Sequence, residues 1–391
     1  MKVVVVGAGA WGLPTAAELA RRGHDVIIVD RYGPGNTLSS SSGPTRLWRV
    51  ADPDAAAIRL GRRAQDAMAR LEGRLGHRVH TSSGLLWRDT DPALRLIADA
   101  VVSEGVDHTE IPATAVGEVF PRLQADGRDA LWFPEAGSLL AAEAIAGYLR
   151  LFGQGGGRTL FGATVSSVAT TPYGVRITLT DGDPLVADAA VLCAGPGTAG
   201  LRDDLGLSIP LHTYLEQVVH VGFTARPHAE DATPCLFDGP GEHGAGIYCM
   251  PTPGVGYKVG LDSPLRELLP GDDDRQPDPG RTEAILQRVG SVLPVPGLQL
   301  VDEFVCCWTD SPDGWFIVDR DESLVVACGD SGKGFKYSPV MGEILADLVE
   351  GGAPDADVDA MSRRRFEGRH LDPHAPPTSL GGPPATGVRT S

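Results

Sequence analysis

The first thirty residues carry the pattern that most restricts how this chain can fold. Lys2–Val6 is a β-branched run, typical of a strand that is buried on both faces of a parallel sheet. A G-x-G-x-x-G pattern follows at once, and apolar residues then recur at helical spacing as far as Gly23. Asp25–Asp30 is a second apolar strand candidate. The sequence therefore predicts a βαβ unit and, around it, an α/β domain with a mostly parallel sheet.

The glycines of this unit predict a dinucleotide site. Gly7 permits a tight turn, Gly9 lets the backbone approach a pyrophosphate, and Gly12 allows close packing of helix against strand. Amides at the start of the helix favour phosphate charge. Asp30 ends the second strand, where a carboxylate can bind the ribose hydroxyls of the adenosine half. The alternative is a purely structural glycine turn, and the pattern alone does not separate nicotinamide from flavin cofactors.

Composition excludes several other classes of function. The 391 residues include 34 Lys and Arg against 51 Asp and Glu, a formal charge of −17, which argues against a nucleic-acid partner. The cysteines form no C-x-x-C pair and no secretory leader is visible, so we expect a cytoplasmic protein without disulfides or a metal site. No apolar stretch reaches the 18 residues of a membrane span. The length predicts roughly two domains.

Later segments predict a mixture of helices and strands. Residues 54–76 place apolar side chains on one helical stripe, and Ser338 can cap a helix that runs to Glu350. Residues 159–195 are typical of short strands separated by turns, whereas residues 211–262 alternate like an antiparallel sheet. The acidic stretch Gly271–Gly280 indicates a solvated loop.

Two C-terminal segments resemble a known family. CCWTDSPDGWFIVD at 306–319 and GDSGKGFK at 329–336 resemble the monomeric sarcosine oxidase family, which includes N-methyltryptophan, pipecolate and fructosyl-amino-acid oxidases within the D-amino-acid-oxidase-like superfamily. The resemblance spans most of residues 1–370 and is densest at the N-terminal unit, 39–49, 248–262 and 306–350. It implies a Rossmann-type FAD-binding domain interleaved in sequence with an antiparallel-sheet substrate domain, hence a fold that is α/β plus α+β.

The resemblance also implies how the flavin and the substrate are held. A cysteine at the position of Cys306 bonds through its sulfur to the flavin 8-methyl carbon in this family. Cys307 is adjacent, so a shift of one residue stays open, and a small buried hydrophobic side chain is the alternative for either cysteine. Lys336 would help to bind the substrate carboxylate, and the helix after it would direct its positive end toward the flavin pyrimidine ring.

Two further segments match the family's active site. In SSSSGPTRLWR at 39–49, Arg46 would lie near the flavin ring and Arg49 would pair with the substrate carboxylate. In GVGYKVGLD at 254–262, Lys258 matches the family's oxygen-activating lysine, a cation that would stabilise developing superoxide. Tyr248 matches an active-site tyrosine. The alternative interpretations are that Arg46 and Arg49 are ordinary surface arginines and that Lys258 lies on a half-exposed strand.

Two positions depart from the family pattern and concern specificity. Asp262 stands where some relatives have histidine, and Trp308 stands where sarcosine oxidase itself has tyrosine. Asp262 could attract a second positive group on the substrate, pair with Lys258, or face solvent, and Trp308 could provide an aromatic wall. Sarcosine itself is therefore not the expected substrate.

Together, the local patterns and the family resemblance imply how the chain divides into domains and which residues bind the cofactor. We expect the FAD-binding domain to comprise 1–82, 145–205 and 316–370, the substrate domain 83–144 and 206–315, and a disordered tail 371–391. The expected cofactor-binding residues are Gly7, Gly9, Ala10, Trp11, Gly12, Asp30, Arg31, Thr45, Arg46, Val165, Gly195, Cys306, Gly332, Gly334, Phe335 and Lys336.

The resemblance implies an FAD-dependent oxidase of an amino or imino acid that forms an imine and reduces oxygen to hydrogen peroxide. The alternative is a dehydrogenase of the same fold that passes electrons to an acceptor other than oxygen. The expected partners are a small amino or imino acid and molecular oxygen, and the expected assembly is a monomer, with a dimer as the alternative.

Overall fold

The N-terminal unit folds as predicted, at the centre of a six-stranded sheet. The computed structural model describes residues 1–201, 211–223, 231–242, 244–269 and 271–368, so the predicted tail at 371–391 lies outside the described residues. The sheet order is β19-β20-β12-β1-β2-β8, parallel except for the edge strand β19. Its strands are β1 (Lys2–Val6), β2 (Asp25–Asp30), β8 (Arg158–Phe161), β12 (Ala189–Leu192), β19 (Ile317–Asp321) and β20 (Leu324–Cys328).

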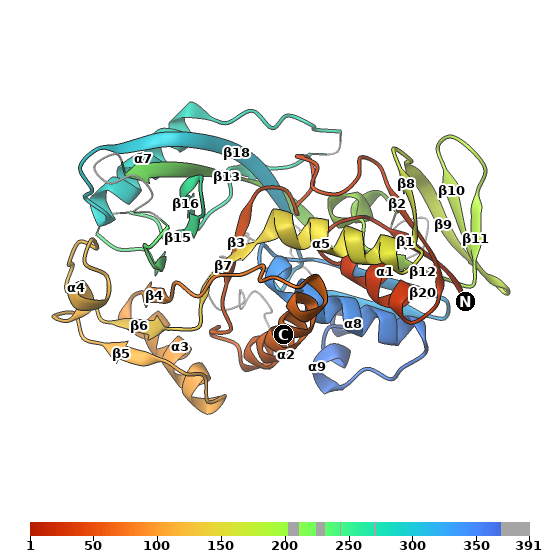
Figure 1. The fold of residues 1–391 in the computed structure, drawn as a ribbon, viewed down its shortest axis with the longest axis horizontal. Helices are drawn as coiled ribbons and strands as arrows, with labels where there is room; N and C mark the ends of the chain where they lie inside the picture. Colours follow the sequence, from red (N-terminus) through yellow and green to blue (C-terminus); the bar gives the residue numbers. More distant parts are fainter. Residues whose placement is uncertain (202–210, 224–230, 243, 270, 369–391) are drawn as a thin grey trace.

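Both faces of this sheet are covered. Val3 and Val5 pack in one apolar cluster with helices, whereas Val4 and Val6 pack in another with a three-stranded sheet, as the alternation of a strand requires. Figure 1 shows α1, α5 and α8 alongside the six-stranded sheet in the right half of the molecule. The helices are α1 (Gly12–Arg21), α2 (Ala55–Leu75), α5 (Ala141–Gln154) and α8 (Ser338–Val349), and the three strands are β9 (Val165–Thr171), β10 (Gly174–Leu179) and β11 (Leu185–Ala187).

The ends of the helices agree with the sequence-based predictions at some positions and differ at others. The carboxylate of Asp54 accepts from the Ala57 amide at 3.0 Å and starts α2, while Gly76 ends it with φ of +79°. Ser338 does not cap α8: it is the first helical residue, because the 3-10 turn η2 (Gly334–Tyr337) leads directly into the helix. The acidic loop is also shorter than predicted, since Asp278 caps α7 (Pro279–Val292) by accepting from the Arg281 amide at 2.7 Å.

The second large sheet has nine strands in the order β17-β13-β16-β15-β14-β4-β6-β5, with β18 paired to β13. All of its strand pairs are antiparallel except β4 with β14, which confirms the antiparallel character predicted for 211–262. In Figure 1 the long β13 and β18 lie at the upper left. The strands are β4 (Leu85–Arg88), β5 (Thr109–Ile111), β6 (Ala130–Phe133), β13 (His212–Phe223), β14 (Cys235–Asp238), β15 (Ile247–Thr252), β16 (Gly256–Leu261), β17 (Arg266–Glu267) and β18 (Leu298–Asp310).

A short antiparallel pair, β3 (Thr45–Trp48) with β7 (Gly137–Leu140), packs against β15 of the nine-stranded sheet. The Thr45 hydroxyl lies 2.6 Å from that of Thr252 on β15, and the Ser138 hydroxyl donates to the Pro251 carbonyl at 2.6 Å. These contacts hold β3 beside the nine-stranded sheet. The remaining short elements are α3 (Asp91–Ser103), α4 (Val116–Val119), α6 (Thr198–Leu201), α9 (Ala356–Asp359), η1 (Gly195–Gly197) and η3 (Arg363–Phe366).

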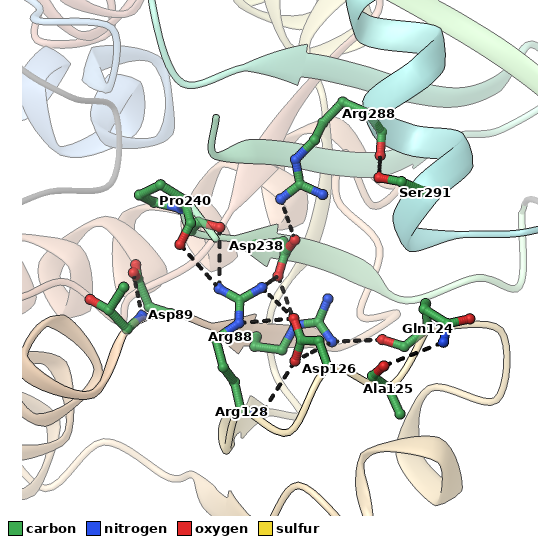
Figure 2. Close-up of polar contacts among 12 residues, drawn as sticks. Arg88, Asp89, Gln124, Ala125, Asp126, Arg128, Asp238, Pro240, Arg288 and Ser291 are labelled. Carbon is green, nitrogen blue, oxygen red and sulfur yellow. Dashed lines mark hydrogen bonds and ion pairs between the residues drawn. The ribbon is translucent and has the colours of Figure 1, made fainter. Parts of the chain in front are cut away.

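A buried network of charges fastens the parallel β4–β14 pair (Figure 2). Asp238, which is fully buried, lies 2.7 Å from Arg88 Nε, 2.8 Å from Arg128 Nη2 and 2.6 Å from Arg288 Nη2. Asp126 supplies a second carboxylate, 3.1 Å from Arg88 Nη1. One carboxylate thus joins two strands, a loop and α7.

In the part of the chain that the structure describes, no helix combines the length and apolar character needed to cross a membrane.

We expect Asp238→Asn to lower the free energy of unfolding by about 3–5 kcal/mol. The buried guanidinium groups of Arg88 and Arg288 would lose their closest carboxylate charge, and Asp126 contacts only the first of them. Urea denaturation measures the effect. Asp91→Asn is the matched control: Asp91 lies 2.6 Å from Arg95, but both side chains are more than 70% exposed, so its loss should change stability little. Equal effects of the two substitutions would contradict a stabilising role for the buried network.

Candidate cofactor and substrate site

One large cavity runs from the N-terminal glycine loop to the nine-stranded sheet. Its empty volume, including the opening to solvent, is about 1450 Å³. Its wall combines the β1–α1 loop, the 39–49 segment, strands β13, β15, β16 and β18, and the 327–336 segment. Predicted site residues on this wall are Gly7, Gly9, Ala10, Trp11, Asp30, Arg46, Arg49, Gly195, Tyr248, Lys258, Cys306, Trp308, Gly332, Gly334, Phe335 and Lys336.

The glycine loop has the close packing that a dinucleotide site needs. Gly7 has φ of +106°, and a Cβ there would clash with the Cys193 carbonyl. A Cβ on Gly12 would clash with the Gly7 carbonyl, so Gly12 keeps α1 against the loop. A Cβ on Gly9 would lie only 3.0 Å from the Ser41 hydroxyl. Gly7 and Gly12 therefore have a steric reason to be glycine, and the loop fits a bound pyrophosphate.

Asp30 is held in place at the cavity by backbone amides. Its Oδ2 accepts from the Ala8 amide at 2.8 Å, and its Oδ1 accepts from the amides of Tyr32 and Gly33 at 2.8 and 2.7 Å. The carboxylate is thus oriented before any ligand binds, as a group that binds ribose hydroxyls requires.

Two segments that are far apart in the sequence meet at this wall. Trp11 Nε1 donates to the Gly334 carbonyl at 3.0 Å, across 323 residues of sequence. A Cβ on Gly334 would lie 2.8 Å from the Trp11 ring, so this close approach requires glycine. The glycine-rich 329–336 segment is therefore shaped to the N-terminal loop.

Arg46 holds the serine-rich loop on the cavity wall. Its guanidinium donates to the carbonyls of Thr45, Ser40 and Ser42 at 2.8, 2.8 and 2.6 Å, and lies 5.4 Å from the Phe335 ring centroid. The group is therefore anchored by neutral carbonyls, and its positive charge stays on the cavity wall without a neutralising carboxylate among these bonds.

A buried charge cluster joins Arg49, Asp52 and Lys336. Asp52 Oδ2 lies 3.1 Å from Arg49 Nη1 and 3.5 Å from Lys336 Nζ, and all three residues are at most 6% exposed. Burial and the neighbouring Arg49 charge lower the pKa of Lys336 well below its usual value. Burial alone would raise the pKa of Asp52, but Arg49 and Lys336 together lower it. The cluster holds two basic groups against one carboxylate, so it favours binding of a further anion.

Lys258 projects from β16 and is 3% exposed. Its Nζ donates to the Thr45 carbonyl at 2.9 Å and lies 5.4 Å from the Phe304 ring centroid. Burial, followed by the charge of Arg46, lowers the pKa of this amine to about 7. Near neutral pH both the charged and the neutral forms of this amine are therefore populated, whereas an exposed lysine is almost entirely charged.

Strand register separates the two adjacent cysteines. Cys306 lies opposite Glu216 of β13, and Cys307 lies opposite Leu215. Successive side chains of a strand point to opposite faces, so Cys306 shares a face with Glu216, and Cys307 packs with Leu215 in a small apolar cluster. Cys307 Sγ nevertheless lies 3.6 Å from the Ser40 hydroxyl, and both cysteines line the cavity. Burial raises the pKa of both thiols.

The wall beyond Cys306 is aromatic. Trp308 stacks obliquely on Tyr214 with ring centroids 5.6 Å apart, and its buried indole N–H has no hydrogen-bond partner among the described residues. The ring of Tyr248 lies over Gly260, where any side chain would clash with it. The rings of Trp308 and Tyr248 line the same cavity as Cys306 and Lys258.

Five predicted site residues lie off the cavity wall as the structure describes it. Gly12 packs α1 against the glycine loop, and the Thr45 carbonyl accepts hydrogen bonds from Arg46 and Lys258. Arg31 is exposed and lies 5.5 Å from the Tyr32 ring. Val165 packs against the apolar cluster between the six-stranded sheet and the three-stranded β9–β11 sheet. Asp262 is half-buried, and its amide donates to the Gly246 carbonyl at 2.7 Å.

The sequence analysis missed three residues that the structure places at the site. Asp52 bridges the two basic anchors, and Ser41 accepts from the Ala10 amide at 2.9 Å. Glu216 lines the cavity with 2% of its surface exposed. Glu216 had a usable signal, since a carboxylate within the apolar run LEQVVHV is costly to bury without a purpose.

Comparison with known proteins agrees with this site. Residues 2–348 match the family model described as "DAO: FAD dependent oxidoreductase". The chain is 26% identical to monomeric sarcosine oxidase of Bacillus sp. (strain B-0618) over 381 residues, which covers 93% of this chain and 95% of the relative. It is 26% identical to N-methyl-L-tryptophan oxidase of Salmonella agona (strain SL483) over 380 residues, covering 93% and 98%.

Among solved structures, NikD, described as an unusual amino acid oxidase essential for nikkomycin biosynthesis, superposes with a TM-score of 0.80 at 23% identity, covering 92% of this chain and 96% of that one. This likeness confirms the predicted mixed fold of parallel and antiparallel sheets. The match of the family model over most of the chain shows that the protein belongs to the DAO family of FAD-dependent oxidoreductases and is a flavin-dependent enzyme.

Proposed function

We propose that this protein oxidises the C–N bond of an amino or imino acid with FAD and passes the electrons to molecular oxygen. The observation that carries the proposal is the single cavity that joins a dinucleotide-type glycine loop to the buried Arg49–Asp52–Lys336 cluster. The glycine loop, Asp30 and the 329–336 segment would hold FAD, which supplies the two-electron acceptor. The printed names of the relatives, sarcosine oxidase and N-methyl-L-tryptophan oxidase, support an amino acid as the substrate class.

In this proposal Arg49 and Lys336 bind the substrate carboxylate. A planar guanidinium matches a carboxylate with two parallel hydrogen bonds. Because Asp52 neutralises one of the two basic groups, a bound carboxylate would complete the charge balance and favour the charged form of Lys336. The carboxylate would orient the amine toward the oxidising part of the cavity, and water would hydrolyse the resulting imine.

Cys306 is the proposed attachment point of the flavin. It shares the cavity-facing side of β18 with Trp308 and lies across from Glu216, whereas Cys307 packs on the apolar side. Lys258 is the proposed oxygen-activating residue, because a buried ammonium stabilises negative charge that develops next to it. We also propose that the protein is a monomer and that its substrate is a small molecule.

Oxygen uptake tests the oxidase against the alternative dehydrogenase. With a substrate that reduces the flavin, we expect one hydrogen peroxide formed for each oxygen consumed, at a rate that an added quinone acceptor does not increase. If turnover instead requires the quinone, and the reduced protein stays reduced in air, the protein is a dehydrogenase.

A further inference from the structure

Glu216 is a buried carboxyl group on the cavity wall that the proposed oxidation does not use. Its Oε1 lies 3.4 Å from Arg281 Nη2, at the long end of hydrogen-bond range. Its Oε2 is buried and has no hydrogen-bond partner among the described residues. Leaving a buried acceptor unpaired is unfavourable, so the retained carboxyl indicates a partner that arrives with a ligand.

Among the described residues, Arg281 is the one basic group within hydrogen-bond range of Glu216, and that contact is long. Burial raises the pKa of Glu216 well above its usual value although Arg281 acts to lower it, and the nearby Asp262 raises it further. Lys258 acts on the same region, but its own pKa is about 7, so it is a partial cation at neutral pH. A donor with a full positive charge would therefore find one carboxyl oxygen available.

The carboxylate anchors have partners different from those of Glu216. Arg49 and Lys336 share Asp52 as their carboxylate partner, whereas Glu216 is approached by Arg281 of α7 and faces Cys306 across the β13–β18 pair. The cavity wall thus carries a basic cluster with one carboxylate partner and, on a different strand pair, a buried carboxyl group with one unpaired oxygen. These two features match a molecule with a carboxylate at one end and a cation at the other.

Building on the proposed function, we propose that Glu216 selects amino acid substrates whose side chain carries a second, positively charged nitrogen. The sequence had suggested Asp262 for such a role, but Asp262 lies off the cavity wall and Glu216 lies on it. Glu216 Oε2 accepts from the side-chain cation while Arg49 and Lys336 hold the carboxylate. Glu216 is then a specificity residue for the oxidation.

Pairs of substrates with the same shape test this assignment. Ornithine and norleucine differ by one terminal nitrogen in place of carbon, as do lysine and 2-aminoheptanoate, and both enantiomers of each would be used. Anaerobic stopped-flow reduction of the flavin gives the ratio of second-order rate constants for each pair. In the wild type we expect the basic member of at least one pair to be favoured roughly 30-fold or more, the loss typical of breaking a buried charge pair.

Glu216→Gln should reduce that ratio to within about threefold, because the amide keeps the shape but removes the charge. Asp91→Asn, the loss of an exposed carboxylate that does not line the cavity, is the control and should leave the ratio unchanged. Glu216→Asp keeps the charge on a shorter side chain and should retain part of the preference, which guards against a folding defect in the amide variant.

Two results would overturn the assignment while leaving the proposed function intact. One is a wild type whose flavin is reduced equally fast by the basic and the neutral member of each pair. The other is a Glu216→Gln variant in which flavin reduction by both members slows by the same factor. The second result would place Glu216 at the reacting amine, which all substrates share. A protein whose flavin is reduced by no amino or imino acid would overturn both proposals.

Discussion

Substituting Cys306 with serine should move the yellow chromophore from the acid-precipitated pellet into the supernatant. The proposed thioether is the one covalent bond that would retain flavin after the fold is destroyed, so the change should be nearly complete. The absorbance of the two fractions after trichloroacetic acid treatment measures it. Cys306→Ser also removes the sulfur that lies across from Glu216 on the cavity-facing side of the strand pair.

Cys307→Ser is the matched control, since it changes the adjacent thiol on the apolar side of β18. This variant should keep its flavin in the pellet. Release by Cys307→Ser and retention by Cys306→Ser would show that the attachment is shifted by one residue. A wild-type protein that releases all its flavin in acid would rule out a covalent bond at either cysteine.

Replacing Lys258 with methionine should slow reoxidation of the reduced protein by oxygen by roughly 10²–10³-fold, the size of effect seen when one preorganised electrostatic group is removed. Methionine keeps the length of the buried side chain and removes the ammonium. Anaerobic reduction by substrate should change far less, because Arg49 and Lys336 remain in place. Stopped-flow mixing with oxygenated buffer measures the two half-reactions separately.

The pH dependence of reoxidation gives an independent check on Lys258. Burial lowers the pKa of this amine to about 7, so its charged form prevails below that pH and is lost above it. Reoxidation should therefore slow as the pH rises through about 7, and the methionine variant should lose this dependence. Lys2→Met, at a half-buried lysine that does not line the cavity, is the control and should reoxidise normally. Unchanged reoxidation of Lys258→Met would remove Lys258 from the oxygen reaction.

Local patterns predicted those parts of the fold whose signals lie close together in the chain. The βαβ unit and α2 carry their own periodicity and caps, such as Asp54 and Gly76, within a few residues. The order of the nine-stranded sheet could not be predicted, because it depends on distant pairs such as β4 with β14, whose registered residues Arg88 and Asp238 lie 150 positions apart.

The site shows the same division. The positions of Gly7, Gly12 and Asp30 follow from the fingerprint, because its geometry is local. Asp52 lies three residues after Arg49, but its contact with Lys336 spans 284 positions and exists only in the folded chain. The cross-strand partner of Cys306 depends likewise on the register of two strands that are far apart in sequence.

The absorption spectrum of the purified protein under nitrogen tests the central claim most directly, namely that one cavity binds FAD and the carboxylate of the amine that it oxidises. A panel of amino and imino acids would be compared with the corresponding amines that lack the carboxylate. We predict that at least one acid bleaches the long-wavelength flavin band while its decarboxylated analogue does so far more slowly, and that Arg49→Ala removes this difference. Bleaching by no acid in the panel, or equal bleaching by acid and amine, would contradict the account.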